Sequence, residues 1–521
     1  IKIRNSSLIE FLYLQKNKNM TKDYSEQEKI RRESLKKIMD LGINPYPANE
    51  YILTTNSKEI KQNYSEKENN FQDISIAGRI MSRRIMGKAS FIELKDFDGR
   101  IQVYLNRDEL CPGDDKSMYN DVFKKFLDIG DIVGIEGNVF VTKVGEISVF
   151  AKKLTVLSKS IKPLPIVKKD SDGKTHDAFK DTELRYRQRS LDLIVNDNAW
   201  SVFESRTKIF NAIRSRLNNM GYIEVETPIL QPIAGGAAAR PFVTHHNTLD
   251  MPLYLRIANE LYLKRLIVGG KEGVFEFAKD FRNEGMDKTH NPEFTMLEFY
   301  VAYKDYNWMM TFVEKLLEET VIEVCGSNKV CFDGKEISFA RPYKKISFFD
   351  AIKNETGDDI SKMTEEELFD YCKEKNIKTD SSMGKGKLYD LIFGEFCEHK
   401  LIQPTYITDY PFEMSPLSKK HRTKQGLTER FELFINAKEI ANAYSEQNNP
   451  IEQRSSFEDQ MRLHERGDDE AMLIDNKFLT ALEYGMPPTS GIGIGMDRLT
   501  MLLTNKQSIQ DVLFFPQMKN D

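Results

Sequence analysis

The residues best suited to chemistry lie in one polar segment that contains Phe281, Arg282 and Glu284 and continues to His290 and Phe294. Its flanks are rich in Val, Phe, Tyr and Met, so we expect a β-hairpin with a long polar loop. An arginine presents a planar fork of donors that matches a phosphate group. The acid and the histidine would complete a phosphate-binding cluster. The alternative interpretation is a surface hairpin with ordinary charges.

A second candidate segment lies near the carboxyl end, where Gly491, Gly493 and Gly495 alternate with apolar residues and lead to Arg498. A dinucleotide-binding fingerprint would need a surrounding βαβ unit, and too little chain remains for one. We therefore expect a strand on whose backbone a ligand can lie flat, with Arg498 at a helix start. Residues 384–387 contain two Gly-Lys pairs but lack the spacing of a P-loop.

These segments must be positioned by the region from about residue 181 to residue 521. Long helices alternate there with antiparallel hairpins, which favours an α+β domain with an antiparallel sheet flanked by helices. A small-residue loop at 235–242 would let a ligand approach the backbone. The predicted elements are helices 182–195, 200–220 and 260–268, strands 222–228 and 253–257, and a helical insertion at about 340–400 with helices 364–374 and 387–397.

The region between about residues 71 and 160 changes to short alternating segments. Five strands are predicted, with an amphipathic helix at 118–127 between the third and the fourth, which fits an OB-fold β-barrel. Cations and an aromatic ring together suit single-stranded RNA, because cations track the phosphates while a ring stacks a base. The strands are 74–86, 90–95, 100–105, 131–139 and 146–157, and the residues in question are Arg79, Arg83, Arg84, Lys88, Phe91 and Arg100.

The remaining segments complete the predicted domain organisation. Residues 1–19 are expected to be a non-native or disordered tail, with a transit peptide as the alternative. Residues 20–70 are predicted to form a helical arm, whose helix 25–41 begins with a capping box. Residues 161–180 are expected to be a linker. The basic face of the arm is either solvated or a contact for nucleic acid, and it carries Lys29, Arg31, Arg32, Lys36 and Lys37.

Composition narrows the class of protein. The chain has 521 residues, enough for two or three domains, and its net charge of −5 means that a nucleic-acid partner would be held by local basic patches. Its five cysteines are scattered without a paired motif, which favours a reducing compartment over disulfides or zinc. No apolar run approaches the roughly 20 residues of a membrane span. We therefore expect a cytoplasmic protein without a membrane partner.

Three segments in order resemble the signature motifs of class II aminoacyl-tRNA synthetases: one ending at Pro228, one spanning 281–298 and one closing on Arg498. With an amino-terminal OB domain, the chain resembles the aspartyl, asparaginyl and lysyl subgroup. Strings at 185–189, 235–242, 282–294 and 467–472 resemble the lysyl-tRNA synthetase family, and the likeness covers nearly all of 71–518. Ala234, where the family usually has proline, and the Asn436-Ala437 pair depart from the pattern at positions that face no ligand.

The resemblance implies an ATP site. Arg282 and Arg498 would be catalytic, with Arg282 on the α-phosphate and the substrate carboxylate and Arg498 on the γ-phosphate. Adenine would lie between Phe294 and Arg498, a cation–π contact. The set is completed by Glu284, His290 and Asn291, and by Glu432 and Glu439, whose hard oxygens would hold Mg²⁺.

The resemblance also implies a lysine site and an anticodon site. A lysine pocket must offset the desolvation of an ammonium group with a buried carboxylate, whereas an aspartate pocket would need a cation there. Glu446, opposite Tyr300, would take the side-chain ammonium. The other lysine-binding residues would be Gly236, Glu260, Arg282, Glu298, Asn442 and Tyr444, and the anticodon would be read by Phe91, Gln102 and Glu146.

The implied function is the ligation of L-lysine to tRNA(Lys) with ATP. Lysyl-adenylate and pyrophosphate would form first, and the terminal ribose hydroxyl of tRNA would then take the lysyl group. The substrate carboxylate is itself the nucleophile, so catalysis consists of in-line positioning and charge stabilisation. A homodimer is expected through the helix 200–220 and the following strand. The alternatives are an aspartyl- or asparaginyl-tRNA synthetase and a non-catalytic RNA-binding paralogue.

Overall fold

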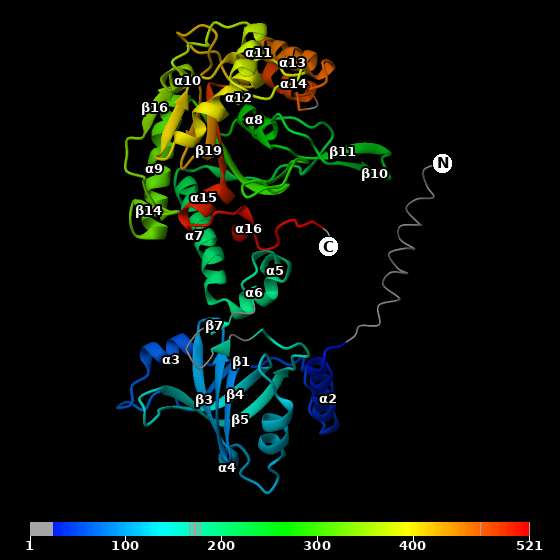
Figure 1. Ribbon diagram of the computed structural model, residues 1–521, viewed down its shortest axis with the longest axis vertical. Coiled ribbons are helices and arrows are strands. Elements are labelled where there is room, and N and C mark those ends of the chain that lie inside the picture. The colour runs from blue at the N-terminus through cyan, green and yellow to red at the C-terminus, as the bar shows by residue number, and fades with distance from the viewer. Residues whose placement is uncertain (1–23, 166–167, 170–174, 177–178, 469, 520–521) are drawn as a thin grey trace. The chain divides into compact units, whose positions relative to one another are not determined.

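A computed structural model describes residues 24–165, 168–169, 175–176, 179–468 and 470–519 (Figure 1). The chain divides after residue 179 into two compact units. The tail expected at 1–19 lies outside the described residues, as does part of the linker expected at 161–180. Within that linker, the two-residue strands β6 (Lys168–Lys169) and β7 (Thr175–His176) pair with each other.

The first unit is a closed five-stranded barrel with the order β1-β2-β3-β5-β4, which confirms the predicted OB-fold topology. Side chains along β2 and β3 alternate between buried and partly exposed, because a barrel strand turns every second residue inward. The π-helical turn η1 (Met118–Phe126) lies between β3 and β4. The barrel strands are β1 (Ile74–Met86), β2 (Ala89–Lys95), β3 (Arg100–Asn106), β4 (Ile132–Val141) and β5 (Ile147–Ser158), and the short helix α4 (Arg107–Leu110) follows β3.

Helices α2 (Glu26–Asp40) and α3 (Ser57–Asn63) pack against this barrel, and their Ile38 and Ile60 are fully buried in its core. The predicted capping box between Ser25 and Glu28 is confirmed. The expected basic face was wrong at Arg31, which is buried and donates to the carbonyl oxygens of Ile129 (2.9 Å) and Ser160 (3.2 Å). Arg31 thus lies on the face of α2 that docks on the barrel, together with Ile38.

The second unit is built on an eight-stranded sheet with the order β16-β17-β18-β19-β20-β13-β12-β8. It is antiparallel except for the pairs at its two ends, β16–β17 and β12–β8. The predicted hairpin is confirmed as β12–β13, with Phe281 opposite Glu293 next to the loop. The strands are β8 (Ile223–Glu224), β12 (Gly273–Phe281), β13 (Glu293–Ala302), β16 (Lys344–Ser347), β17 (Thr405–Thr408), β18 (Arg430–Phe434), β19 (Glu439–Ser445) and β20 (Thr489–Gly495).

Helices cover both faces of this sheet, as predicted (Figure 1). Phe275 and Phe299 face α7 (Asp197–Asn219) and α9 (Tyr306–Cys325), and they share one apolar core with those helices. The alternate residues Val274 and Tyr300 face the opposite side, where the core is completed by α8 (Glu260–Val268) and α14 (Asn476–Glu483). Because side chains alternate along a strand, Glu298 must face the α8 side as well.

Three of the predicted elements differ in the structure. The helix expected at 182–195 is broken at Gln188 into α5 (Thr182–Arg187) and α6 (Arg189–Val195), and Asp192 then pairs with both Arg185 and Arg189. The strand expected at 222–228 is only the two-residue β8, at the sheet's edge. The insertion expected at about 340–400 also contributes β16 to the main sheet beside its helices α10 (Phe348–Thr356), α11 (Glu365–Glu374) and α12 (Lys385–Phe396).

The remaining elements of this unit lie on both sides of the sheet. A small three-stranded sheet with the order β10-β11-β9 carries a hairpin that projects from the body of the unit (Figure 1). Its strands are β9 (Leu230–Gln231), β10 (Val243–His246) and β11 (Met251–Leu255), and the late helices are α13 (Pro450–Glu465), α15 (Met496–Leu503) and α16 (Ile509–Val512).

Candidate active site

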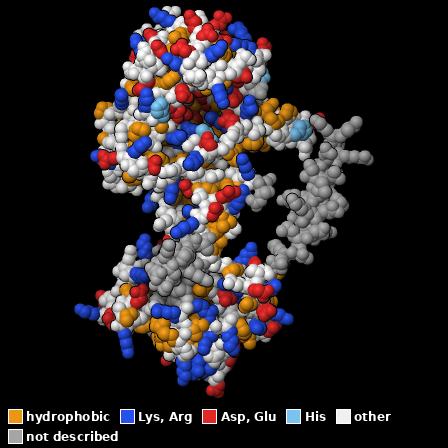
Figure 2. Space-filling model, in the orientation of Figure 1, with side chains coloured by type: hydrophobic (Ala, Val, Ile, Leu, Met, Phe, Trp, Pro, Cys, Tyr) orange, Lys and Arg blue, Asp and Glu red, His pale blue; other side chains and the backbone are white. Residues whose placement is uncertain are grey.

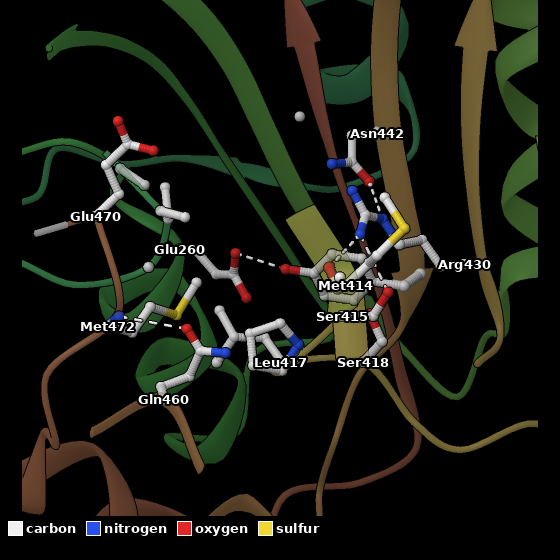
Figure 3. A pocket seen from close by; sticks show the side chains of 18 of the residues that line it. Glu260, Met414, Ser415, Leu417, Ser418, Arg430, Asn442, Gln460, Glu470 and Met472 are labelled. Carbon is white, nitrogen blue, oxygen red and sulfur yellow. Dashed lines mark hydrogen bonds between the residues drawn. The ribbon is translucent and has the colours of Figure 1, made fainter. Parts of the chain in front are cut away.

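A cavity of about 490 Å³ opens on the α8 side of the large sheet (Figure 3). Acidic and basic side chains gather around a recess on this unit (Figure 2). The strands β13, β18, β19 and β20 form the floor, and the loop after β12 supplies Arg282. The predicted site residues that line this cavity are Gly236, Glu260, Arg282, Glu298, Tyr300, Glu432, Glu439, Asn442 and Tyr444.

Glu446 lies just behind this lining, at the end of β19, and only 2% of its surface is exposed. Its Oε1 has no hydrogen-bond partner among the described residues, and its Oε2 pairs with the Lys264 ammonium. Glu260 accepts a hydrogen bond from the Tyr444 hydroxyl (2.6 Å) and pairs with the same lysine. This end of the cavity therefore has buried negative charge that the protein compensates only in part.

The glycines of β20 make room for these acids. Gly493 lies opposite Glu298 across the sheet, and a Cβ at Gly493 would come within 2.4 Å of Glu298 Oε1. Tyr300, two residues further along β13, donates its hydroxyl to Glu298 (2.9 Å). The sequence had suggested that a ligand lies flat on this strand, but much of the space over the strand holds the protein's own side chains.

The electrostatics of this end favour a cationic ligand. Burial, followed by repulsion from Glu260, raises the pKa of Glu298 to about 8. Burial also raises the pKa of Glu446 well above its ordinary value, although Lys264 opposes the rise. A carboxylate that is hard to ionise in an empty site becomes easy to ionise when a ligand brings an opposite charge. An ammonium group would bring the positive charge that these buried carboxyl groups need in order to ionise.

The other end of the cavity presents arginines. The Arg282 guanidinium lies 5.2 Å from the centre of the Phe294 ring, and its Nε has no partner among the described residues. Arg498 donates to the backbone carbonyl of Glu439 (2.8 Å), and its Nη2 lies 3.2 Å from His290 Nε2. A second cavity of about 520 Å³ adjoins this region and is lined by His290, Glu432, Glu439 and Arg498, among others.

Arg498 is held by a buried network at the start of α15. The preceding residue, Asp497, accepts a hydrogen bond from the Thr295 backbone amide (2.7 Å) and pairs with Arg206 of α7 (2.7 Å). These contacts join the first turn of α15 to the hairpin strand β13 and to α7. They anchor the backbone from which the Arg498 side chain extends.

Glu432 and Glu439 face the same cavities from β18 and β19. Burial raises the pKa of Glu432 to about 7, Arg430 opposes the rise and Glu439 adds to it. Tyr410 donates to Glu432 (2.8 Å), as does Arg430 (2.6 Å). Within the described part of the chain, no group of three or more potential ligands forms a protein-only metal cage.

Glu284 and Asn291, which were predicted for the ATP site, do not line either of these cavities. Glu284 is exposed in the loop after β12 and is not among the residues that line these cavities. Asn291 is half-buried, with its amide donating to Glu293 O (2.6 Å) and its side-chain oxygen accepting from the Gln517 amide (3.3 Å). In this structure Asn291 ties the hairpin loop to the carboxyl-terminal segment.

Several lining residues were not expected from the sequence. Arg430 donates to Asn442 Oδ1 (3.1 Å) as well as to Glu432, and its spacing of two from Glu432 on a strand could have placed it on this face. The insertion, in which the sequence suggested no chemistry, contributes Lys387 and Asp390. Lys387 pairs with Glu470 (2.7 Å), so the insertion and the loop before α14 meet at the cavity rim.

The barrel of the first unit has its own pocket, about 390 Å³ in volume. Phe91, Gln102 and Glu146, the three residues that the resemblance implied for anticodon reading, line it together. The Arg84 guanidinium lies 5.6 Å from the centre of the Phe91 ring, and Gln102 donates to Ser148 (2.9 Å). The other lining residues are Lys61, Ser82, Arg84, Ile92, Glu93, Arg100 and Ile101.

Two of the basic residues expected on this RNA-facing surface have another role. Arg79 donates to the Gly130 carbonyl (2.7 Å), and Arg83 donates to carbonyls that include Lys124 O (2.7 Å). These arginines hold β1 against the segment after η1, because carbonyls at the end of a helix lack internal partners. The positive charge at the pocket itself comes from Lys61, Arg84 and Arg100.

Comparison with known families fits both units. Residues 181–519 match the family model for tRNA synthetases class II (D, K and N), and residues 74–157 match that for the OB-fold nucleic acid binding domain. The first match alone covers more than half of the chain. The chain therefore belongs to the class II tRNA synthetases of the D, K and N group.

Individual relatives narrow the family further. The lysine–tRNA ligase of Porphyromonas gingivalis is 61% identical over 498 residues, which span 95% of this chain and 86% of the relative. That of Christiangramia forsetii is 62% identical over 502 residues, 96% of this chain and 88% of the relative. That of Azobacteroides pseudotrichonymphae is 60% identical over 495 residues, 95% and 99% respectively. Within its class, the chain belongs to the lysine–tRNA ligase family.

Proposed function

We propose that this protein activates L-lysine with ATP and transfers it to the 3′-terminal ribose of tRNA(Lys). The observation that carries the proposal is Glu446, a buried carboxylate whose Oε1 has no hydrogen-bond partner among the described residues and whose Oε2 pairs with the Lys264 ammonium. It lies behind the Tyr300 and Tyr444 side of a cavity that Arg282 also lines. A substrate with an ammonium at the tip of its side chain and a carboxylate at its head matches both ends.

Lysine would be bound by charge at three points. Glu446 and Glu260 face the side-chain ammonium, with Tyr300 and Tyr444 beside them. Glu298, Asn442 and the backbone at Gly236 suit the α-ammonium group, and Arg282 suits the carboxylate. A buried charged group costs several kcal/mol to desolvate, and opposed charges at close range offset that cost. The match of charges at both ends therefore supports lysine over an uncharged amino acid.

The activation step needs no general base, because the lysine carboxylate is already ionised. Its oxygen attacks the α-phosphorus of ATP, the bond to the β-phosphate oxygen breaks, and pyrophosphate leaves. Arg282 contacts both reactants and holds them in line, while Arg498 takes the charge of the outer phosphates. A ribose hydroxyl of tRNA then attacks the acyl carbon of lysyl-adenylate, and AMP leaves.

Mg²⁺ would accompany ATP and bind to Glu432 and Glu439. These residues fit a hard cation, because both carboxylates face the cavity and Glu439 makes Glu432 harder to ionise. Burial also raises the pKa values of Asp390 and Glu398, and Glu439 contributes to both shifts. When bound, the ion would offset the negative charge of the phosphates.

The anticodon of tRNA would be read at the barrel pocket. Phe91 would stack a base, Gln102 and Glu146 would contact its edge, and Lys61, Arg84 and Arg100 would meet the neighbouring phosphates. The family match of residues 74–157 to a nucleic acid binding domain supports this assignment.

A homodimer is the assembly that we propose, with α7 and the short edge strand β8 at its interface. β8 leaves one side of the large sheet open. Apolar side chains gather around that edge with over two-fifths of their surface exposed, namely Ile223, Ile229 and Leu230. An open edge that carries apolar side chains is commonly covered by another chain.

A cytoplasmic location is proposed on the state of the cysteines. All five cysteines of the sequence lie in the described part of the chain and are free thiols. Free thiols persist in reducing compartments. Among the described residues, no helix combines the length and the apolar character needed to cross a membrane.

Aminoacylation tests the proposal directly. The purified protein should attach labelled lysine to a tRNA(Lys) transcript when ATP and Mg²⁺ are present, and the product should be sensitive to mild base, as an ester is. Charging of tRNA(Asp) or tRNA(Asn) with aspartate or asparagine in place of lysine would reverse the assignment within the class. Binding of tRNA without any charging would favour the non-catalytic alternative.

A further inference from the structure

One buried cation near the lysine site has no part in the mechanism described above. Lys264 lies on the second turn of α8, and none of its side chain is exposed. Its ammonium pairs with Glu260, four residues earlier on the same helix, and with Glu446 from the end of β19. The rings of Tyr444 and Phe478 lie 5.4 Å and 5.7 Å from it. The two acids that it contacts are those proposed to receive the substrate's side chain.

A charge balance shows what this lysine does for the pocket. Glu260, Glu298 and Glu446 bring three carboxylates to one buried region, and Lys264 offsets one of them. Once all three carboxylates are ionised in the complex, two negative charges are left for the substrate. Lysine carries two ammonium groups, and its carboxylate is met separately by Arg282. The pocket is thus short of the two positive charges that a diamino acid supplies.

The protonation state of Lys264 is secured by its partners. Burial alone would lower the pKa of its ammonium, but Glu260 and Glu446 outweigh burial and raise the pKa above its ordinary value. The Lys264 ammonium therefore stays charged at neutral pH. In return it opposes the rise in the pKa of Glu446 and, more weakly, of Glu298.

We propose that Lys264 is a positioning residue that determines specificity: its fixed ammonium holds the Glu446 and Glu260 carboxylates in place and sets the net charge that the pocket offers to a diamino acid. This inference rests on the proposed function. Without Lys264, a buried carboxylate would take up a proton, and the pocket would lose part of its preference for a charged side chain.

Two substitutions separate charge from packing. Lys264→Met keeps the length of the side chain and removes its charge, and Lys264→Gln keeps a hydrogen-bond donor without the charge. The matched control is Lys271→Met, because Lys271 is an exposed lysine just after the same helix. Pyrophosphate exchange is measured for each protein with varied lysine, varied ATP and varied L-norleucine, which is lysine without its side-chain ammonium.

The groups that titrate around Lys264 define the expected pH profile. Glu260 faces it from α8, Tyr444 and Glu446 from β19, and Glu298 and Tyr300 from β13. In both charge-removing variants, the KM for lysine should rise at least about tenfold at neutral pH and recover towards about pH 9, because lysine must then displace a proton. The KM for ATP should change less than about threefold. The preference for lysine over norleucine should fall by at least about tenfold.

The outcomes are decisive in either direction. A wild-type-like lysine KM in Lys264→Gln would overturn the charge-setting role, as would equal rises in the KM for lysine and for ATP without a pH dependence. If Lys264→Met proves insoluble, Lys264→Gln decides alone. Absence of lysine-dependent exchange in the wild type refutes the proposed function itself, whereas normal wild-type exchange with unaffected variants refutes only the role of Lys264.

Discussion

Gly491 on β20 lies opposite Tyr300 on β13, and a Cβ at this glycine would come within 2.2 Å of both the Tyr300 ring and Glu446 Oε1. No side chain can occupy that position unless the floor of the pocket moves. The glycine therefore provides the space in which the buried acid reaches the cavity. Its role follows from neighbouring strands, not from any flexibility of its own chain.

Gly491→Ala should disable lysine recognition. The added methyl group must push either Tyr300 or Glu446 out of position, and overpacking of this kind costs about 1–3 kcal/mol of stability. We expect the KM for lysine in pyrophosphate exchange to rise by more than about tenfold, with a modest fall in Tm. Gly113→Ala is the control, because a Cβ at Gly113 meets nothing within 4 Å. Equal effects in the two variants would contradict the reserved-space explanation.

Glu446→Gln should impair lysine binding while ATP binding persists. Loss of one partner from a buried charge pair typically costs about 2–5 kcal/mol, so the KM for lysine should rise by roughly 30-fold or more. ATP affinity, measured by isothermal titration without lysine, should change little because the arginine end of the cavity is untouched. An unchanged lysine KM would show that the ammonium binds elsewhere.

Binding of lysine should release a proton. The unfolded chain ionises Glu298 near its ordinary value of 4.5, whereas the folded protein holds the proton up to about pH 8. The free energy of unfolding should therefore fall as the pH rises through this window in the free protein, since the folded state binds the extra proton. A bound ammonium group favours the ionised form of Glu298, so this carboxyl group loses its proton when lysine binds. Calorimetry of lysine binding at pH 7 in buffers of different ionisation enthalpy should detect release, and buffer-independent heats would contradict it.

Phe91→Ala should weaken tRNA charging and spare amino-acid activation. Loss of a stacked base costs about 1–3 kcal/mol, which corresponds to roughly a 5- to 150-fold fall in kcat/KM for tRNA. Lysine-dependent pyrophosphate exchange, which needs no tRNA, should stay at the wild-type rate. Phe97→Ala, at a highly exposed ring in the same barrel, is the control. Joint loss of charging and exchange would disprove the division of labour between the two units.

Ile223→Lys should weaken the proposed homodimer. The side chain lies on the edge strand β8 and is 42% exposed, so a charge there would be buried without a partner in a dimer. Light scattering should give twice the chain mass for the wild type and a concentration-dependent shift towards the monomer for the variant. Ile451→Lys, at an exposed position on α13, should remain dimeric. A monomeric wild type would rule out this interface.

Local patterns predicted much of the fold. The helix α8 has the predicted bounds Glu260–Val268, and the hairpin β12–β13 and the five barrel strands lie within two residues of their expected ends. These elements are set by alternation, helical periodicity and turn residues, which are properties of neighbouring residues in the chain. The acids, arginines and glycines of the cavity could be proposed because the segments that hold them resemble motifs of a known family.

Contacts between distant segments could not be predicted in the same way. The pairing of Lys264 with Glu446 joins α8 to the end of β19, and nothing in either local sequence specifies the partner. The sequence pattern groups Arg31 with the exposed cations of its helix, but in the structure it donates to carbonyl oxygens of the barrel unit. The insertion's strand β16 and its Lys387 reach the main sheet and the cavity only through tertiary packing.

Amino-acid-dependent pyrophosphate exchange is the measurement that tests the central claim most directly. With ATP, Mg²⁺ and labelled pyrophosphate, the wild-type protein should form labelled ATP when lysine is added, and aspartate, asparagine or norleucine should give at most a small fraction of that rate. Exchange that depends on aspartate or asparagine and not on lysine would contradict the assignment of Glu446 and its neighbours as the lysine site.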